Sequence, residues 1–326
     1  MKIHRRSCLQ LIAGAAALPS SGEIAIGQET YPSRPIRVIV GFTPGTAADI
    51  TARAFGSVAA DILGQKITVE DKPGAGSSLA AEYVARAAKD GYTLFLVSSA
   101  NVTSEAMNSH PAFELVRDFE AVSLLTSVAV VLVASTQSNL HSVADLIALA
   151  KAKPGEVLCA NVGVGSHVHM AAELFAQRAG IKLLHVPYPG SPQAVTDLVA
   201  GRVTMSFSPA STVIGQIAAG KVVALATAAS RRAEALPNAP SMAESGMPNF
   251  DTSLWFGLVA PAGTPQTAVE KIAGAAGKAM RMPETIEALK KQGFEPLGEG
   301  PDAFGRYLRD EVARWSEVAR VAGLRS

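Results

Sequence analysis

The feature that most constrains this chain is a regular alternation of short β-branched runs with helical segments. Residues 35–42 (PIRVIVGF), 66–70 (KITVE) and 92–99 (YTLFLVSS) are typical of strands, and helical patterns at 46–63 and 78–88 separate them. Strands joined through helices pair in parallel, because a parallel connection must return along the whole sheet. The sequence therefore predicts an α/β fold with a parallel sheet covered by helices.

A second alternating set follows the first. We expect strands at 157–161, 182–188, 203–207, 222–227 and 253–261, and helices at 143–152, 167–179, 191–200, 211–219, 265–280, 283–291 and 302–321. The extended apolar stretches 121–135 and 254–261 predict two crossings between the sets, with the C-terminal helices returning to the first lobe. This pattern predicts two lobes around a hinged cleft, residues 30–124 plus 255–326 and residues 125–254. One continuous sheet is the alternative.

The N-terminus is typical of an export signal. A basic start, an apolar run at 9–18 and small residues at 25 and 27 predict a signal peptide over residues 1–27, cleaved before Gln28. Arg5–Arg6 resembles a twin-arginine signal, although Cys8 stands where that pattern prefers Phe. The alternative is an uncleaved anchor, but the apolar run is short for a membrane span. We therefore expect the mature protein in the periplasm.

The composition narrows the possible partners. Hydrophobic residues make up 48% of the 326-residue chain, charged residues 17%, and the formal net charge is +1. Because no basic run follows the N-terminus, nucleic acid is a poor candidate partner. Cleavage after residue 27 would leave Cys159 as the single cysteine, which excludes an intramolecular disulfide.

Two glycine-containing loops precede predicted helices, GFTPGTAAD (41–49) and NVGVGSHVH (161–169). The first lacks the Gly-Lys-Ser/Thr of a Walker loop, and Val168 replaces the third glycine of a dinucleotide fingerprint in the second, so a nucleotide cofactor is not expected. Unpaired N–H groups at helix N-termini favour anions. Hydroxyls of Thr43, Thr46 and Ser166 would strengthen such a site, and the alternative is that both loops are merely tight turns and caps.

The ionisable residues near these loops favour structural roles. Asp49 falls in the first helical turn, where a carboxylate offsets the helix dipole, and this favours a capping role over a general base. His167, His169 and Glu173 match no strong zinc pattern, so no metal is expected. We expect His169 to brace its loop by bonding nearby backbone, and His185 to be a satisfied core histidine.

No catalytic constellation is evident. Ser166 lacks the flanking glycines of a nucleophile elbow, and Cys159 lies in an apolar strand without an adjacent base. Tyr188 and Gly190 form a third possible cleft loop, whereas Trp255–Phe256 fits either ligand stacking or hinge packing.

The quoted loops are part of a wider resemblance that covers essentially the whole predicted mature chain. Its carriers are YPSRPIRVIVGFTPGTAADITAR, VEDKPGAGSSLAAEYVARAAKDGYTL, NVGVGSHVHMAAELF, HVPYPGSPQAVTDLVAGRV and LWFGLVAPAGTP. In these segments the chain resembles the Bug-type periplasmic solute receptors of tripartite tricarboxylate transporters. The resemblance implies a two-lobed Venus-flytrap fold that binds small organic anions, usually carboxylates, through backbone groups and ordered waters.

Carried over residue by residue, the resemblance implies a carboxylate clamp between the lobes. The expected ligand-binding residues are Phe42, Thr43, Pro44, Gly45, Thr46, Ala47, Asp49, Ser98, Ser99, Asn101, Gly163, Gly165, Ser166, His169, Tyr188 and Ser208. Two of these depart from the family pattern. Thr46 replaces the second glycine of a usual Pro-Gly-Gly, which would be costly if that position needs a positive φ. Ser208 replaces an aspartate that could pair with an amino-acid ammonium, which favours a ligand without an amine.

Together these inferences predict a non-enzymatic receptor for a di- or tricarboxylate or an aromatic carboxylate. The resemblance implies delivery to the transmembrane permease of a tripartite tricarboxylate-type transporter, and we expect a monomer without cofactor or metal. One alternative is a ligand sensor for a two-component system. The other is a secreted hydrolase or isomerase that uses Ser166, His169 and Asp49.

Overall fold

The computed structural model describes residues 31–325, so the predicted signal peptide lies outside the described residues. One sheet contains β1 (Ile36–Val40), β2 (Ile67–Asp71), β3 (Thr93–Ser98), β4 (Phe119–Val128), β10 (Leu254–Pro261) and β11 (Phe294–Glu299), in the order β11-β4-β10-β3-β1-β2. The second contains β5 (Val130–Ser135), β6 (Leu158–Asn161), β7 (Leu184–Pro187), β8 (Met205–Pro209) and β9 (Val222–Thr227), in the order β7-β6-β8-β5-β9. The structure therefore has two sheets, and the alternative of one continuous sheet is wrong.

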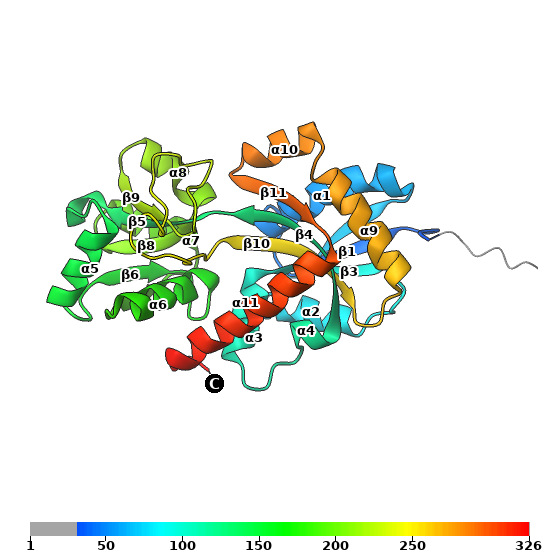
Figure 1. The fold of residues 1–326 in the computed structure, drawn as a ribbon, viewed down its shortest axis with the longest axis horizontal. Helices are drawn as coiled ribbons and strands as arrows, with labels where there is room; N and C mark the ends of the chain where they lie inside the picture. The colour runs from blue at the N-terminus through cyan, green and yellow to red at the C-terminus, as the bar shows by residue number, and fades with distance from the viewer. Residues whose placement is uncertain (1–30, 326) are drawn as a thin grey trace, which may run out of the picture. The chain divides into compact units, whose positions relative to one another are not determined.

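Helices flank both sheets (Figure 1). They are α1 (Ala47–Leu63), α2 (Ser78–Ala85), α3 (Ser99–Met107), α4 (Leu115–Asp118), α5 (Val143–Ala152), α6 (His167–Ala179), α7 (Ser191–Val199), α8 (Ala210–Ala218), α9 (Gln266–Ala279), α10 (Pro283–Lys290) and α11 (Pro301–Val321), with short 3₁₀ turns η1 (Ala75–Ser77) and η2 (Thr136–Ser138). Among residues 31–325, no helix combines the length and hydropathy that a membrane span requires.

The strand directions agree with the expected mostly parallel sheets. β1 pairs in parallel with β2 and β3, and β6 pairs in parallel with β7 and β8, as the strand–helix–strand pattern predicts. β10 runs antiparallel to both β3 and β4, so β4 points in the same direction as β3, and β11 runs antiparallel to β4. β5 runs antiparallel to both β8 and β9. Four strands of each sheet therefore share one direction, and β5, β10 and β11 make the two sheets mixed.

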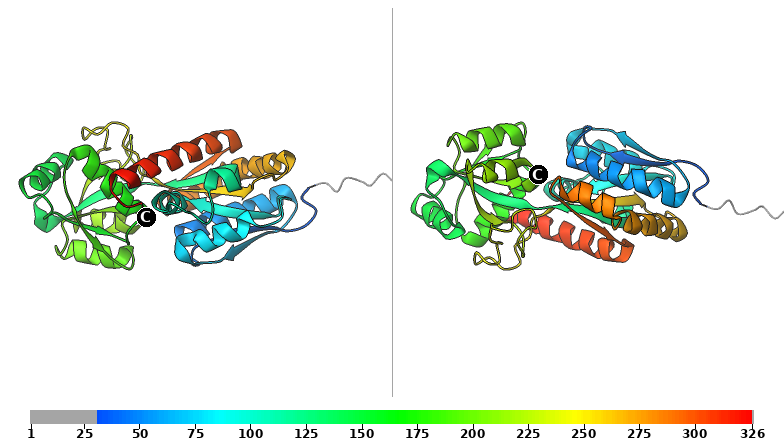
Figure 2. Two further views of the ribbon diagram at one scale, coloured as in Figure 1. Left: turned by 90° about the horizontal axis from the view of Figure 1, so that it is seen from below. Right: turned by 90° about the horizontal axis from the view of Figure 1, so that it is seen from above.

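Long strands carry the chain between the sheets. β4 and β5 form one extended run interrupted at Ala129, and β10 pairs with β3 and β4 after the chain leaves the second sheet. α11 packs against β4 and α3 and also contacts α6 (Figure 2). The first sheet is therefore assembled from both ends of the described chain.

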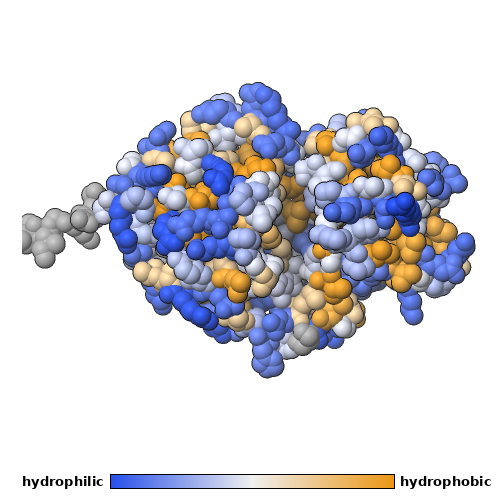
Figure 3. Space-filling model, turned by 180° about the vertical axis from the view of Figure 1, so that it is seen from behind, coloured by the Kyte–Doolittle hydropathy of each residue, from blue (hydrophilic) through white to orange (hydrophobic). Residues whose placement is uncertain are grey.

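A continuous apolar core stabilises this arrangement. One buried cluster joins Phe95 of the first sheet with Phe175 and Phe207 of the second sheet's layer, and it includes Trp255. Trp255 is 1% exposed and its indole Nε1 donates to Glu311 at 2.9 Å, which supports hinge packing over ligand stacking. Hydrophobic residues also line a hollow between the two halves of the face shown in Figure 3.

Candidate functional site

Three loops meet at the carboxyl ends of β1, β2 and β3. These strands are parallel, so the segments that follow them lie at one edge of the sheet. A Cβ built on Gly41 would lie 1.8 Å from Ser77 Oγ, which places the loop after β1 directly against η1. Ser77 is absent from the residues expected from the sequence, although its position after a parallel strand was a usable signal.

Asp49 holds the first loop in place. The Gly45 N–H donates to Asp49 Oδ2 at 2.8 Å, and Arg53 Nε lies 2.6 Å from Asp49 Oδ1. Asp49 is 4% exposed, and its two oxygens face groups of this protein. The carboxylate therefore braces the loop and the start of α1, in agreement with the role that its helix position favours.

Thr46 lies in an ordinary backbone region. Its φ is −77° and its ψ is 165°, whereas the preceding Gly45 has a φ of +79°. The Thr46 hydroxyl donates to the Thr43 carbonyl at 2.8 Å and does not cap α1. The first-turn N–H groups of Ala47 and Ala48 therefore have no cap from this side chain and face the loop. Thr43 and Pro44 are exposed.

The start of α3 provides buried polar groups. Ser98 N and Ser98 Oγ both donate to Asn101 Oδ1, at 2.9 and 3.0 Å. Within residues 31–325, Asn101 Nδ2, Ser99 Oγ and Ser77 Oγ are buried without a hydrogen-bond partner. A buried polar group without a partner is destabilising by about 1–3 kcal/mol, so such groups mark a place where polar ligands are favoured.

The second loop joins β6 to α6 and makes its own hydrogen bonds. Gly163 N donates to Asn161 Oδ1 at 3.0 Å, and Gly165 N donates to His169 Nδ1 at 3.0 Å. Ser166 Oγ donates to the Gly163 carbonyl at 2.8 Å and accepts from His169 N at 3.3 Å as the N-cap of α6. His169 thus braces its loop through backbone, as expected.

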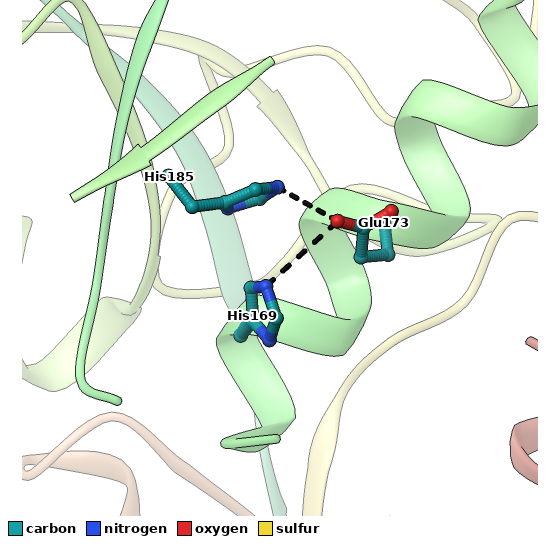
Figure 4. Close-up of side chains that lie close together, drawn as sticks. All are labelled: His169, Glu173 and His185. Atoms are coloured by element: carbon teal, nitrogen blue, oxygen red, sulfur yellow. Dashed lines mark ion pairs between the residues drawn. The ribbon is translucent and has the colours of Figure 1, made fainter. Parts of the chain in front are cut away.

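His169 also belongs to a side-chain cluster (Figure 4). Glu173 Oε1 lies 2.9 Å from His185 Nε2 and 3.8 Å from His169 Nε2, and the two imidazole rings pack edge to face at 4.4 Å. Burial and the neighbouring His185 lower the pKa of His169, whereas Glu173 opposes this shift. The hydrogen bond from His185 lowers the pKa of Glu173. The cluster therefore consists of a carboxylate and a neutral His169 at neutral pH.

His169, Glu173 and His185 are also close enough to be considered as a metal site. Their hydrogen bonds do not fit one, however. His169 Nδ1 accepts from Gly165 N, so its proton is on Nε2, the nitrogen that faces Glu173. A metal at that nitrogen would require moving the proton to Nδ1 and breaking the loop contact.

Two further predicted residues have partners within the second lobe. Tyr188 N donates to the Asn161 carbonyl at 2.8 Å, which places Tyr188 beside the second loop, and its hydroxyl donates to Asp197 at 2.8 Å. Ser208 is 3% exposed and its hydroxyl lies 3.0 Å from Ser206 Oγ. Ser208 is therefore part of a buried serine pair on β8.

The two loops are not joined directly. No hydrogen bond within residues 31–325 connects the loop 41–46 with the loop 162–166. The second loop instead contacts the end of α3, where a Cβ on Gly165 would lie 2.1 Å from Met107 Sδ. α3 thus connects the buried donors near Asn101 with the second loop.

A cavity of about 420 Å³ lies elsewhere, between residues 229–235 and β10, β11 and α11. None of the predicted ligand-binding residues lines it. Its basic residues are paired, since Arg231 contacts Glu295, Arg232 contacts Glu244 and Lys290 Nζ lies 2.6 Å from Glu234. It therefore presents fewer available donors to a carboxylate than the three loops, and we place the candidate site at the loops.

The residues of the hydrolase alternative do not form a nucleophile–base pair. The Ser166 hydroxyl donates to a backbone carbonyl, and both ring nitrogens of His169 face other groups. Burial raises the pKa of the Cys159 thiol to about 12, which keeps it protonated and unreactive. This geometry suits binding better than nucleophilic catalysis.

Comparisons with known proteins identify the family to which the chain belongs. Residues 51–324 match the family model described as "Tripartite tricarboxylate transporter family receptor". Protein BugT of Bordetella pertussis is 36% identical over 300 residues, which cover 91% of this chain and 92% of BugT. R. palustris Rpa4515 with adipate has a TM-score of 0.77 at 29% identity, covering 90% of this chain and 98% of that one. MatC from Rhodopseudomonas palustris with bound malate has a TM-score of 0.74 at 30% identity, covering 88% and 99%. The chain therefore belongs to the tripartite tricarboxylate transporter receptor family.

Proposed function

We propose that this protein is a periplasmic receptor that binds a small organic acid and delivers it to the permease of a tripartite tricarboxylate-type transporter. The observation that carries the proposal is the set of donors at the ends of β1, β2 and β3. The first turn of α1 has no cap from Thr46, and Ser77, Ser99 and Asn101 supply buried donors without partners within residues 31–325. Similarity to receptors solved with malate and adipate supports a dicarboxylate as the ligand class.

The contacts divide the predicted residues into two roles. Gly45, Gly163 and Gly165 donate their N–H groups within the protein, so these residues shape the loops. The helix N-terminus contributes about 0.3–1 kcal/mol of attraction for an anion, and a hydrogen bond to a charged group about 1.5–3 kcal/mol. The proposed grip therefore comes chiefly from the α1 N-terminus and from Asn101 and Ser99, with closure about the strands that cross at Ala129.

The proposed ligand lacks an amine. Ser208, which stands where an aspartate could pair with an ammonium group, bonds to Ser206 and is buried. We include no catalytic step, because the Ser166 hydroxyl faces backbone instead of a base. We propose export with cleavage before Gln28, which N-terminal sequencing of the periplasmic fraction tests.

Calorimetry against malate, adipate, citrate, benzoate and aspartate tests the binding site. Asn101→Asp keeps an oxygen that accepts from Ser98 and replaces the unpartnered amide with a second anionic oxygen. We expect the dicarboxylate affinity to fall at least about tenfold, or about 1.4 kcal/mol. The exposed Asn249→Asp is the matched control and should bind normally. Failure of every acid to bind would refute the function, and normal binding by Asn101→Asp would refute the site.

A further inference from the structure

We propose that His169, Glu173 and His185 position the ligand loop 162–166, so that carboxylate affinity depends on an unprotonated Nδ1 of His169. This inference rests on the proposed function and assigns positioning residues to the same site. The relevant cluster is drawn in Figure 4. It joins α6 to β7 and reaches both glycine N–H groups of the loop.

The first connection runs through His169. The Gly165 N–H donates to His169 Nδ1 at 3.0 Å, so Nδ1 must carry a lone pair. The ring proton then lies on Nε2, which faces Glu173 Oε1 at 3.8 Å. The carboxylate favours this tautomer, because a proton facing a negative charge is stabilised.

The second connection runs through His185. His185 Nε2 donates to Glu173 at 2.9 Å, and its Nδ1 lies 3.4 Å from Asn161 Nδ2. The other atom of that amide, Asn161 Oδ1, accepts from Gly163 N at 3.0 Å. One carboxylate therefore orients both histidines, and through them two backbone donors of the loop.

These contacts matter because the loop is rich in conformational freedom. Gly165 has a φ of +78° and Gly163 a φ of +110°, conformations that glycine exchanges readily with others. Fixing both N–H groups selects one loop conformation and holds Gly165 against Met107. A loop that is ordered before the ligand binds loses less conformational entropy on binding, which increases affinity.

Protonation of His169 at Nδ1 would break its hydrogen bond with the Gly165 N–H. A proton on Nδ1 would face the Gly165 N–H, so two donors would oppose each other and the loop would have to move. The titratable groups that face His169 are Glu173 of α6 and His185 of β7, and Cys159 of β6 lies opposite His185 and near Glu173. Burial and His185 lower the pKa of His169, and Cys159 stays neutral. Affinity should therefore be constant above the ordinary histidine range and fall as the pH falls below it.

Two isosteric variants separate positioning from general packing. In His169→Asn the amide oxygen can occupy the place of Nδ1 and still accept from Gly165, whereas His169→Gln places its polar group at the Nε2 position. At pH 7.5 we expect His169→Asn to bind the best acid of the malate, adipate, citrate and benzoate panel within about threefold of the parent protein. We expect His169→Gln to bind it about tenfold more weakly, the loss of roughly one hydrogen bond. The exposed His141→Gln is the control and should leave affinity unchanged.

The pH dependence of ligand affinity is the measurement that a purely structural role of His169 would not affect. Between pH 7.5 and 5 the parent protein should lose at least about twofold more affinity than His169→Asn, because titration of the acid itself is common to both proteins. Equal affinity of the two His169 variants, or parallel pH profiles for parent and His169→Asn, would overturn the proposal. Imidazole ¹⁵N spectra of the ligand-free protein provide a second test. A proton on Nδ1 of His169 at pH 7.5 refutes the positioning role even if no acid binds, whereas failure of binding with Nε2 protonated refutes only the proposed function.

Discussion

Replacing Gly165 by alanine tests whether the loop 162–166 packs against the end of α3. Gly165 has a φ of +78°, where an L-residue is destabilised by about 1–2 kcal/mol. Its new Cβ would also lie 2.1 Å from Met107 Sδ, and because this is the far end of a flexible, half-buried side chain that can turn away, the steric cost lies at the low end for overpacking, about 1 kcal/mol. We therefore expect the free energy of unfolding to fall by about 2–3 kcal/mol.

Gly155→Ala is the matched control. Gly155 has a φ of +79°, almost the same as Gly165, but no heavy atom lies within 4 Å of the position that its Cβ would occupy. This variant should show the backbone effect without the steric one. Met107→Ala in the Gly165→Ala background should restore the steric part, with a coupling energy of about 1 kcal/mol.

Urea denaturation of the four proteins, with the Met107→Ala single variant to complete the cycle, measures these quantities. Calorimetric titration with malate or adipate should show weaker binding by Gly165→Ala than by Gly155→Ala. The packing argument is wrong if the two glycine variants unfold at the same urea concentration, or if Met107→Ala gives no rescue.

Three further predictions concern single groups. Thr46→Ala should change the free energy of unfolding by less than about 1 kcal/mol in urea, because its hydroxyl bonds only a loop carbonyl and does not cap α1; a larger loss would show a role that these contacts omit. Burial lowers the pKa of His167 to about 4, so stability should decrease as the pH falls from about 6.5 towards 4, by up to about 3 kcal/mol; His167→Gln, whose amide can still donate to Thr252, should flatten this part of the profile. Burial raises the pKa of Glu105 to about 7, so its contribution has the opposite sign and stability is lost as the pH rises from about 4.5 to 7. Allowing for partial solvent screening, Glu105→Gln should gain about 1–3 kcal/mol relative to the parent protein at pH 8, and no relative gain would contradict the assignment.

The sequence predicted the strands and helices with strong periodicity, but it missed α3 and β11 for physical reasons. α3 (SANVTSEAM) is rich in Ser, Thr and Asn, which have weak helix propensity, and tertiary packing against α11 and η1 stabilises it instead. β11 contains Pro296 and Gly298 and therefore does not resemble a strand. Pro296 is tolerated because β11 lies at the edge of its sheet and its register with β4 shifts after Pro296.

Local sequence predicted the two loops of the candidate site but not the residues that contact them. The loops before α1 and α6 were identifiable from glycine, hydroxyl residues and the following helical period. The partners of those loops were not, because Ser77 packs on Gly41 and His185 meets Glu173 only after the strands have paired. Sequence spacing also could not show that Gly45 and Gly165 use their N–H groups internally, which depends on the rotamers of Asp49 and His169.

The division of the strands between the sheets has a consequence for folding kinetics. The second sheet uses a continuous part of the chain, from β5 to β9, whereas β4 of the first sheet pairs with β10 and β11 near the C-terminal end. Contacts between distant segments form late, because a long loop must close before they stabilise anything. We therefore expect the β5–β9 region to gain amide protection first during refolding, and the first sheet to remain open until nearly the whole chain is present. This order would keep the first sheet incomplete until β10 and β11 have been synthesised.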